Sequence, residues 1–476
     1  MKKFWRFLTF TTVFIVAGVQ TTALASNLPD LGNEFRSMIS ISDERLIGDM
    51  MLREIRATGL AHTDPIVNEY VKHLGNKLTP YMSMPYNNLH IKFFALNDTS
   101  INAFAFFGGH VAVHSGLILV TDSESELAGV MAHELAHISQ QHVLRQMADS
   151  KRLMPVTLAE SLAAIALGVP ELIIPAMAGH AQQMLNFSRQ HEQEADRLGL
   201  QILAKANFDP QGLPNILQRM GSSLRYHNKP PEYLLSHPLS ESRIADTRSR
   251  ADSLDYKRQP SSNMFHLVKA RLAVQNTSNL HHYVQEAEHI LNTQRYNNKL
   301  AAHYAYAYAL LQKGESHKAW DAISSLSTAY PDDMIIQMTA ADIEVQQHKI
   351  ALAKKRLQHL LQIYPDSSAV LLQYAEVLLH TKESHQAKKI LDKYKSLHNP
   401  EPMFYEYVRQ TEGMLGNQTA VLEANAEWYQ LHGDFNSALK QLATALSQSS
   451  IDQKSAKRIK TRIAELEELV IRLKKV

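Results

Sequence analysis

Hydrophobic and polar positions follow two different patterns along the chain of 476 residues. From residue 26 to about residue 256 (26–256), strand-like alternation is mixed with helical periodicity. The stretches 88–96 and 109–120 alternate with a period near two, which predicts strands, and Gly108-Gly109 predicts a turn between them. This part is therefore expected to form an α+β domain, mainly helical with a small sheet.

The second part of the chain, residues 263–476, repeats with a period of 34 residues and shows no strand-like alternation. Small residues recur at this spacing in two series: Ala307, Ala341 and Ala375, then Ala319, Ala353 and Ala387. The tripeptide Tyr-Pro-Asp at 330–332 recurs at 364–366. The pattern resembles the tetratricopeptide repeat, in which small residues let paired helices touch and a proline ends the second helix. A non-repeating helical bundle is the alternative.

The repeat changes register toward the C-terminus. Ala438 lies 51 residues after Ala387, which is one and a half periods, so the register slips by one helix near residue 417. Residues 263–476 are thus expected to form an all-α superhelix of tetratricopeptide repeats. Superhelices of this type offer a concave groove to peptides or partner proteins.

The first 25 residues have the pattern of an export signal. A basic start is followed by an apolar run, residues 7–19, and then by Ala23-Leu24-Ala25, a small-x-small cleavage site. The apolar run is short for a membrane span, and an uncleaved anchor is the alternative. The pattern predicts a signal peptide over residues 1–25 and a bacterial periplasm as the compartment.

Composition narrows the classes of function. Without the three basic residues of the predicted signal, the net charge falls from +2 to −1. A charge this small gives no reason to expect that the protein binds nucleic acid. The chain has no cysteine, so an oxidising compartment is tolerated but not used for disulfides. With 45% hydrophobic and 20% charged residues, the chain is typical of globular proteins with two or three domains.

The first candidate catalytic and metal-binding residues lie in the stretch 123–147, which is predicted to be helical. Ser123 is the expected N-cap of this helix and Glu126 its capping-box partner. His133 and His137 are four residues apart, so on a helix both imidazoles can reach one metal ion. Glu134 projects beside them and can take a proton from metal-bound water. Zinc suits two imidazoles and a carboxylate with one open position, so the pattern predicts one zinc ion per chain.

The stretch 187–199 supplies the expected third ligand, Glu192. Asp196 lies one helical turn later and is expected to accept a hydrogen bond from a ligand imidazole, which fixes the tautomer of that ring. Taken alone, this stretch could be a solvated acidic face. Paired with the His-Glu helix, it indicates a gluzincin-type metal site.

Other histidines are not assigned as ligands. His110 and His114 are also four residues apart, but in a strand this spacing is roughly 13 Å, too far to chelate one ion. His142 and His191 flank the two motifs and are expected at the surface or behind the ligands.

The motifs HELAH (133–137), SRQHEQEAD (188–196) and the stretch 102–117 resemble the zinc metallopeptidase family that includes the CAAX prenyl protease. The order of export signal, peptidase domain and repeats resembles the periplasmic members of that family. By this resemblance, Val111 and Val113 would lie on an edge strand that pairs with an extended substrate. The resemblance also implies outer-membrane β-barrel proteins and their assembly complex as partners.

The stretch 236–248 also resembles the family. His237 would approach the zinc as a regulatory fourth ligand in the water position, or, moved aside, donate to the developing oxyanion. Arg243 would anchor the segment or assist substrate binding with its charge. A helix start with His237 before a proline is the simpler alternative for this stretch.

Residues 153–185 form an apolar stretch between the two metal motifs, divided by prolines into pieces too short to cross a bilayer. A mobile lid over the zinc cleft is the preferred interpretation. Plain core and peripheral contact with a membrane surface are the alternatives.

These patterns predict a zinc metallopeptidase domain over residues 26–256, with Glu134 as general base and acid and Asp196 in support. The family resemblance implies a periplasmic endopeptidase that removes misassembled or unfolded clients and has a chaperone-like role in β-barrel assembly. A repeat-based scaffold or chaperone with a structural or latent zinc site is the rival hypothesis. A membrane-surface enzyme acting on lipidated peptides is a third.

Overall fold

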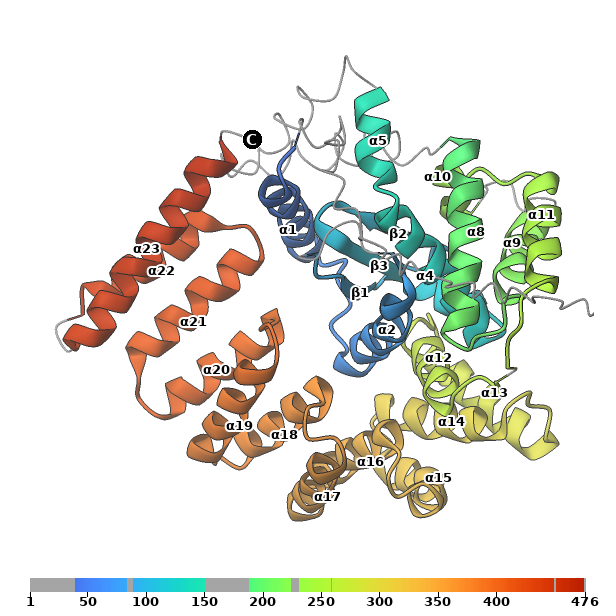
Figure 1. The fold of residues 1–476 in the computed structure, drawn as a ribbon. Coiled ribbons are helices and arrows are strands. Elements are labelled where there is room, and N and C mark those ends of the chain that lie inside the picture. The colour runs from blue at the N-terminus through green and yellow to red at the C-terminus, as the bar shows by residue number, and fades with distance from the viewer. Residues whose placement is uncertain are drawn as a thin grey trace, which may run out of the picture.

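The computed structural model of the protein describes residues 39–83, 89–149, 188–223, 231–257, 259–448 and 451–474. The predicted signal peptide (1–25) and the predicted lid (153–185) lie outside the described residues. Helices dominate both parts of the chain, and the strands that the structure describes all lie in the N-terminal part (Figure 1).

In its described residues, the N-terminal part, α1 to α11, combines helices with three short strands. Its elements are α1 (Ile41–Ala57), α2 (Pro65–Leu78), the 3-10 turn η2 (Thr79–Tyr81), β1 (Lys92–Leu96), β2 (Ala103–Phe106), the 3-10 turn η3 (Phe107–Gly109), β3 (His110–His114), α3 (Ser115–Val120), α4 (Glu124–Ser139), α5 (His142–Asp149), α8 (Arg189–Lys205), α9 (Gly212–Ser223), α10 (Glu232–Ser236) and α11 (Glu241–Asp252).

The strands form one sheet in the order β1-β3-β2, with β1 parallel and β2 antiparallel to β3. Gly108 and Gly109 connect β2 to β3 with φ angles of 73° and 79°, a left-handed conformation that glycine adopts without strain. The predicted turn thus exists, but it joins β2 to β3 and does not follow the strand at 92–96 directly.

The strand predicted over 109–120 is too long. It ends at His114, and residues 115–120 form the helix α3, in which the Thr121 N–H bonds to the Leu117 carbonyl. Leu117 and Ile118 are fully buried. Because a short apolar run fits a buried helix as well as a buried strand, its pattern could not separate the two.

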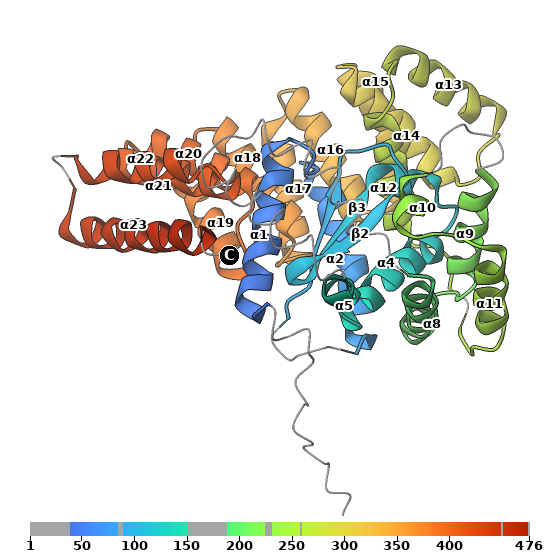
Figure 2. The ribbon, with the colours of Figure 1, turned by 90° about the horizontal axis from the view of Figure 1, so that it is seen from above.

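Both faces of the sheet are covered. Alternate side chains of the strands, including Val111 and Val113, join the main core with α2 and α4. The other face, with Phe94 and Phe106, packs against α1. Figure 2 shows α1 between the sheet and the last helices of the repeat part. The sheet is therefore a small, enclosed platform, which holds α4 in place beside β2.

The repeat part, α12 to α23, is built from helices of 12 to 21 residues. They are α12 (Asn263–Gln275), α13 (Leu280–Thr293), α14 (Lys299–Gln312), α15 (Ser316–Ala329), α16 (Met334–Gln346), α17 (Ile350–Ile363), α18 (Ser368–His380), α19 (Ser384–Leu397), α20 (Pro402–Met414), α21 (Gln418–Leu431), α22 (Phe435–Leu446) and α23 (Gln453–Leu473).

The period of 34 residues corresponds to one helical hairpin, as predicted. The six alanines of the two series are buried at helix contacts: Ala307, Ala319, Ala341, Ala353, Ala375 and Ala387. The predicted change of register is also confirmed. Ala387 and Ala438 are each the fourth residue of a helix, α19 and α22, but two helices separate them where the regular repeat has one.

The repeat part curves around the N-terminal part (Figure 1). The polar contacts that join them include three ion pairs or hydrogen bonds to α1, α2 and the residue before α2: Arg271 of α12 pairs with Asp64 at 2.5 Å, Glu69 of α2 accepts from the Ala369 N–H of α18 at 2.7 Å, and Arg56 pairs with Glu401 at 2.5 Å. The concave side predicted to receive partners is thus partly occupied by the chain's own α1 and α2.

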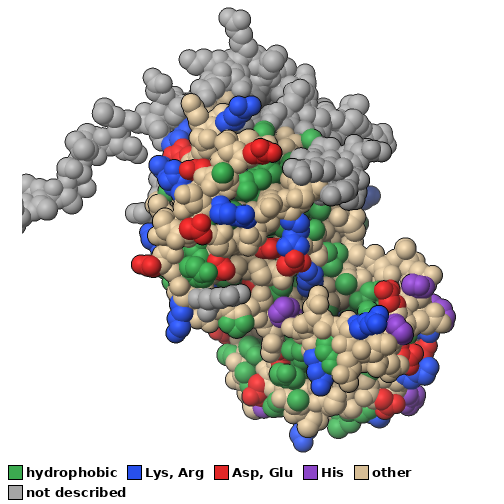
Figure 3. Space-filling view, turned by 90° about the vertical axis from the view of Figure 1, so that its right-hand side faces the viewer, with side chains coloured by type: hydrophobic (Ala, Val, Ile, Leu, Met, Phe, Trp, Pro, Cys, Tyr) green, Lys and Arg blue, Asp and Glu red, His purple; other side chains and the backbone are tan. Residues whose placement is uncertain are grey.

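Basic and acidic side chains are interspersed on the face seen in Figure 3, in keeping with the small net charge of +2. Among the described residues, no helix combines the length and the apolar character that crossing a membrane requires.

Candidate metal centre

Helix α4 presents His133, Glu134 and His137 inside the protein. Its N-cap is Ser123, whose hydroxyl accepts from the Glu126 N–H at 3.3 Å, as predicted. The Glu126 carboxylate accepts from the N–H of Asp122, one residue before the expected partner. The two imidazoles of the motif face one point, with their Nε2 atoms 3.0 Å apart.

Helix α8 brings Glu192 to the same point. The close packing of α8 on α4 depends on Gly199, because a Cβ there would lie 3.1 Å from the backbone nitrogen of His133. Glu192 Oε1 lies 3.3 Å from His137 Nε2, and its Oε2 lies 3.6 Å from His133 Nε2. One turn later, Asp196 Oδ1 lies 2.9 Å from His133 Nδ1, on the side of the ring that faces away from the cluster.

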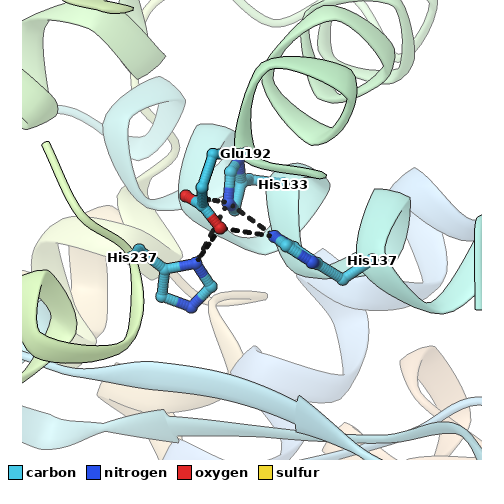
Figure 4. Close-up of side chains that lie close together, drawn as sticks. All are labelled: His133, His137, Glu192 and His237. Atoms are coloured by element: carbon cyan, nitrogen blue, oxygen red, sulfur yellow. Dashed lines mark hydrogen bonds and ion pairs between the residues drawn. The ribbon is translucent and has the colours of Figure 1, made fainter. Parts of the chain in front are cut away.

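His237 completes the cluster from the turn that follows α10 (Figure 4). Its Nδ1 lies 3.0 Å from Glu192 Oε1 and 3.4 Å from His133 Nε2. Its Nε2 lies 3.5 Å from Glu134 Oε1. The ring stacks on Tyr233 at 4.4 Å, which holds it over the cluster.

The four groups have the chemistry and the spacing of a zinc site. One donor atom from each of His133, His137, Glu192 and His237 lies within 4.8 Å of the other three. Neighbouring donors are 3.0 to 3.4 Å apart. Ligands at about 2.0 Å around a tetrahedral ion are separated by roughly 3.3 Å, so these residues fit zinc in both donor type and spacing.

The electrostatics of the cluster also favour a cation. Burial alone would raise the pKa of Glu192, but the charges of His237 and Arg243 hold it well below its usual value. Burial alone would lower the pKa of His133, but hydrogen bonds to Asp196 and Glu192 raise it to about 9. The two carboxylates thus create a negative electrostatic potential that stabilises a positive charge on His133. A metal ion bound in the same place would be stabilised by the same potential.

Glu134 differs from the other acid of the cluster, because burial raises its pKa. Its Oε2 accepts the N–H of Ala105, in β2, at 3.0 Å. A carboxylate with a raised pKa beside a metal position has the property that a general base needs.

Arg243, from α11, lies beneath the cluster. It pairs with Asp196 through Nε and Nη2 at 2.5 and 2.9 Å, and with Glu192 at 2.5 Å. It also donates to the carbonyl of Pro238 at 3.0 Å, which fixes the turn after His237. The residue is 3% exposed, and these contacts are the ones expected of an anchor, while a role in substrate binding stays a prediction.

The prediction of an edge strand at Val111 and Val113 is wrong. Both residues lie on β3, which pairs with β1 on one side and with β2 on the other. Every residue of β3 is buried, as is typical of a central strand. The strand that borders the cluster is β2, because the N–H of Ala105 points away from β3 toward Glu134.

A small hollow of about 30 Å³ adjoins His137. It lies between the end of β2, α1 and the start of α5. Its walls are mainly apolar: Ala105, Phe106, Phe107, Gly109, Ile138, Val143 and Leu144, with Glu44, His137 and Gln141.

The chain is similar to known proteins over nearly its whole length. It is 34% identical over 456 residues to the Beta-barrel assembly-enhancing protease of Escherichia coli (strain K12), covering 94% of this chain and 93% of that protein. It is 33% identical over 470 residues to the protein of that name from Yersinia pestis, covering 97% and 96%. It is 28% identical over 214 residues to the Mitochondrial metalloendopeptidase OMA1 of Schizosaccharomyces pombe, covering 45% and 59%.

Residues 65–251 match peptidase family M48, and residues 344–404 match the tetratricopeptide repeat. The fold and the cluster on α4 and α8 therefore define a metalloendopeptidase with C-terminal tetratricopeptide repeats. The chain belongs to the beta-barrel assembly-enhancing protease family. The family resemblance found in the motifs is thus confirmed, together with the α+β fold and the helical repeats.

Proposed function

We propose that this protein is a periplasmic zinc endopeptidase that hydrolyses unfolded or misassembled outer-membrane β-barrel proteins. The observation that supports this most directly is the cluster of four donor atoms, all within 4.8 Å of one another, beside Glu134, a carboxylate that contacts the outer edge of β2. We assign the peptidase to residues 26–256 and the repeats to residues 263–476.

His133, His137 and Glu192 would hold the zinc, with His237 as a fourth ligand at rest. Bound zinc would supply Lewis acidity toward water and toward the scissile carbonyl. Asp196 lies 2.9 Å from His133 Nδ1, where it would accept the proton of that nitrogen and leave the lone pair of Nε2 directed at the metal position. Arg243 balances the charge of both carboxylates and so keeps Glu192 ionised in a buried site.

Glu134 is the general base and then the general acid. Its carboxylate takes the proton of the attacking water and passes it to the amide nitrogen as the peptide bond breaks. Burial keeps its pKa above the usual value, which makes its carboxylate a stronger base toward the attacking water than an exposed glutamate.

The outer edge of β2 is the proposed site for the substrate backbone. The residues that alternate with Phe104 and Phe106, namely Ala103 and Ala105, direct their backbone groups away from β3. An extended segment could add to β2 as a further strand, with a side chain in the apolar hollow beside His137. An extended segment is what an unfolded β-barrel protein offers.

The resting enzyme would be restrained by His237. This imidazole lies within 3.5 Å of Glu134, in the space that the attacking water needs. Cleavage therefore requires the turn after α10 to move, and Arg243 and Tyr233 oppose that movement.

The repeats would bind clients or the β-barrel assembly complex and add a chaperone-like role. Two relatives over nearly the whole chain bear the name Beta-barrel assembly-enhancing protease, which supports this assignment and a place in the bacterial envelope. The signal-like pattern of residues 1–25 supports export to the periplasm.

Purified wild type and Glu134→Gln test the proposal. Each should contain one zinc per chain, and only wild type should cleave casein or an unfolded β-barrel protein. Zinc-loaded wild type and Glu134→Gln with equal cleavage would contradict the role of Glu134. Absence of zinc from both would contradict the metal site.

A further inference from the structure

A second histidine lies directly behind the predicted ligand His137. Helix α4 ends at Ser139, and Gln141 has a φ of 54°, a left-handed residue that turns the chain back before α5 begins. This turn places the first residue of α5, His142, against the outer side of His137. His142 is completely buried, although it begins a helix.

We propose that His142 and Glu194 are positioning residues, which together fix the tautomer of His137 so that its Nε2 lone pair faces the metal. This inference rests on the proposed metal site. It adds two residues of the chain to that site, neither of which is a ligand.

The geometry forms a continuous path from His137 to a carboxylate. His137 Nε2 faces the cluster, and its Nδ1 lies 3.0 Å from His142 Nδ1. His142 Nε2 in turn lies 3.1 Å from Glu194 Oε2. Arg145 contacts the same carboxylate oxygen at 3.3 Å and helps to hold it.

The path determines which atoms hold protons. An ionised carboxylate only accepts hydrogen bonds, so His142 must donate to Glu194 from Nε2. A singly protonated imidazole then has a bare Nδ1, which accepts from His137 Nδ1–H. His137 is left with a lone pair on Nε2, the form that binds metal.

The reverse arrangement would prevent metal binding. If His142 donated from Nδ1, His137 would have to accept at its own Nδ1, and its single proton would sit on Nε2. That proton would point into the cluster, 3.0 Å from His133 Nε2. A second proton on His142 would set two N–H groups against each other across 3.0 Å.

Helix α8 therefore serves the two ligand imidazoles in different ways. Asp196 contacts His133 directly at 2.9 Å, whereas Glu194 acts on His137 through His142. Glu192, Glu194 and Asp196 are alternate residues of the same helix. The Asp196 side chain is 2% exposed and that of Glu194 is 29% exposed, so we expect the Glu194 path to be the weaker of the two.

The test uses the full chain and zinc alone as the ligand. His142→Leu removes both hydrogen bonds and keeps an apolar side chain in the space. His142→Gln can still donate to Glu194 and accept from His137. His191→Leu is the packing control, because His191 stacks on His142 at 4.4 Å but lies outside the path.

Zinc affinity, measured by competition with a chelator, should fall at least about 10-fold in His142→Leu. It should stay within about threefold of wild type in His142→Gln and His191→Leu. The imidazole ¹⁵N spectrum of the zinc-loaded wild type should show a proton on His137 Nδ1. Circular dichroism should show the same helix content in all three variants.

Equal affinity in His142→Leu and wild type would overturn the inference, and so would an equal loss in His142→Gln and His142→Leu, which would indicate packing alone. Failure of the wild type to bind zinc would instead overturn the proposed function on which the inference rests. The two failures are therefore distinguishable.

Discussion

Ala105 donates its backbone N–H to the Glu134 carboxylate across 3.0 Å, so the edge of the sheet and the proposed general base are in direct contact. The contact places the proposed binding site of the substrate backbone, at the edge of β2, directly beside the proposed general base. Because β2 is an edge strand and β3 is central, the contact supports the proposal that the substrate lies beside β2.

Replacing Ala105 by proline removes this N–H and should reduce cleavage of an unfolded β-barrel protein at least about 10-fold, because one donor at the edge and one support of Glu134 are lost. Ala105→Gly keeps the N–H and is the matched control, at a cost of about 1 kcal/mol in strand stability. Comparable rates for the two variants would argue against β2 as the substrate strand. Zinc content should be unchanged in both.

Asp196→Asn keeps the shape of the side chain but removes its charge. An amide can turn its NH₂ toward His133 Nδ1, which favours the wrong tautomer of a ligand. We expect zinc affinity to fall about 10- to 100-fold, with the far-ultraviolet circular dichroism unchanged. Chelator competition measures the affinity, and a value equal to wild type would show that Asp196 does not position His133.

Asp64→Ser tests the attachment of the repeats to the N-terminal part. Serine can still cap α2, where Asp64 accepts from the Ile66 N–H at 2.9 Å, but it leaves the buried Arg271 without its ion pair. The expected loss is on the order of 3 kcal/mol, seen as a lower melting temperature by calorimetry. Adding Arg271→Met should recover most of the loss, and a double variant as unstable as the single one would contradict this account.

The same ion pair predicts a dependence on pH. Burial alone would raise the pKa of Asp64, but the neighbouring Arg271 outweighs it and lowers the pKa below 3.8. A lowered pKa in the folded protein means that the stabilisation is present above 3.8 and is lost as pH falls through the folded value. The difference in melting temperature between wild type and Asp64→Ser should therefore be constant from pH 7 to 5 and shrink below pH 4. A difference as large at pH 3 as at pH 7 would assign the effect of Asp64→Ser to something other than charge.

Local spacing was enough to predict that His133, His137 and Glu192 could meet at one point, and to predict the repeats. His133 and His137 are one helical turn apart, and the alanines of the repeats recur at a fixed 34 residues, so each pattern depends only on neighbours along one helix or one hairpin. The position of Glu192 and Asp196 on one face of α8 followed from the same periodicity.

Contacts between segments that are far apart in the sequence could not be predicted from the spacing of residues. The position of β3 at the centre of the sheet depends on β1 and β2, which lie on both sides of it, and alternation along one strand does not reveal its neighbours. The approach of His142 to His137 depends on a single left-handed residue, Gln141, that no glycine or asparagine signals. The secondary structure of the short apolar run 115–120 could not be predicted either, because a run of this length fits a helix or a strand.

The most direct test of the central claim is the coordination shell of the bound metal, measured by X-ray absorption at the zinc edge for wild type and His237→Ala. The account predicts three imidazole nitrogens and one carboxylate oxygen at about 2.0 Å in wild type. In His237→Ala, one imidazole should be replaced by water, and cleavage of an unfolded β-barrel protein should become faster. An identical shell in the two proteins, or slower cleavage by His237→Ala, would contradict the claim that His237 restrains a zinc peptidase at rest.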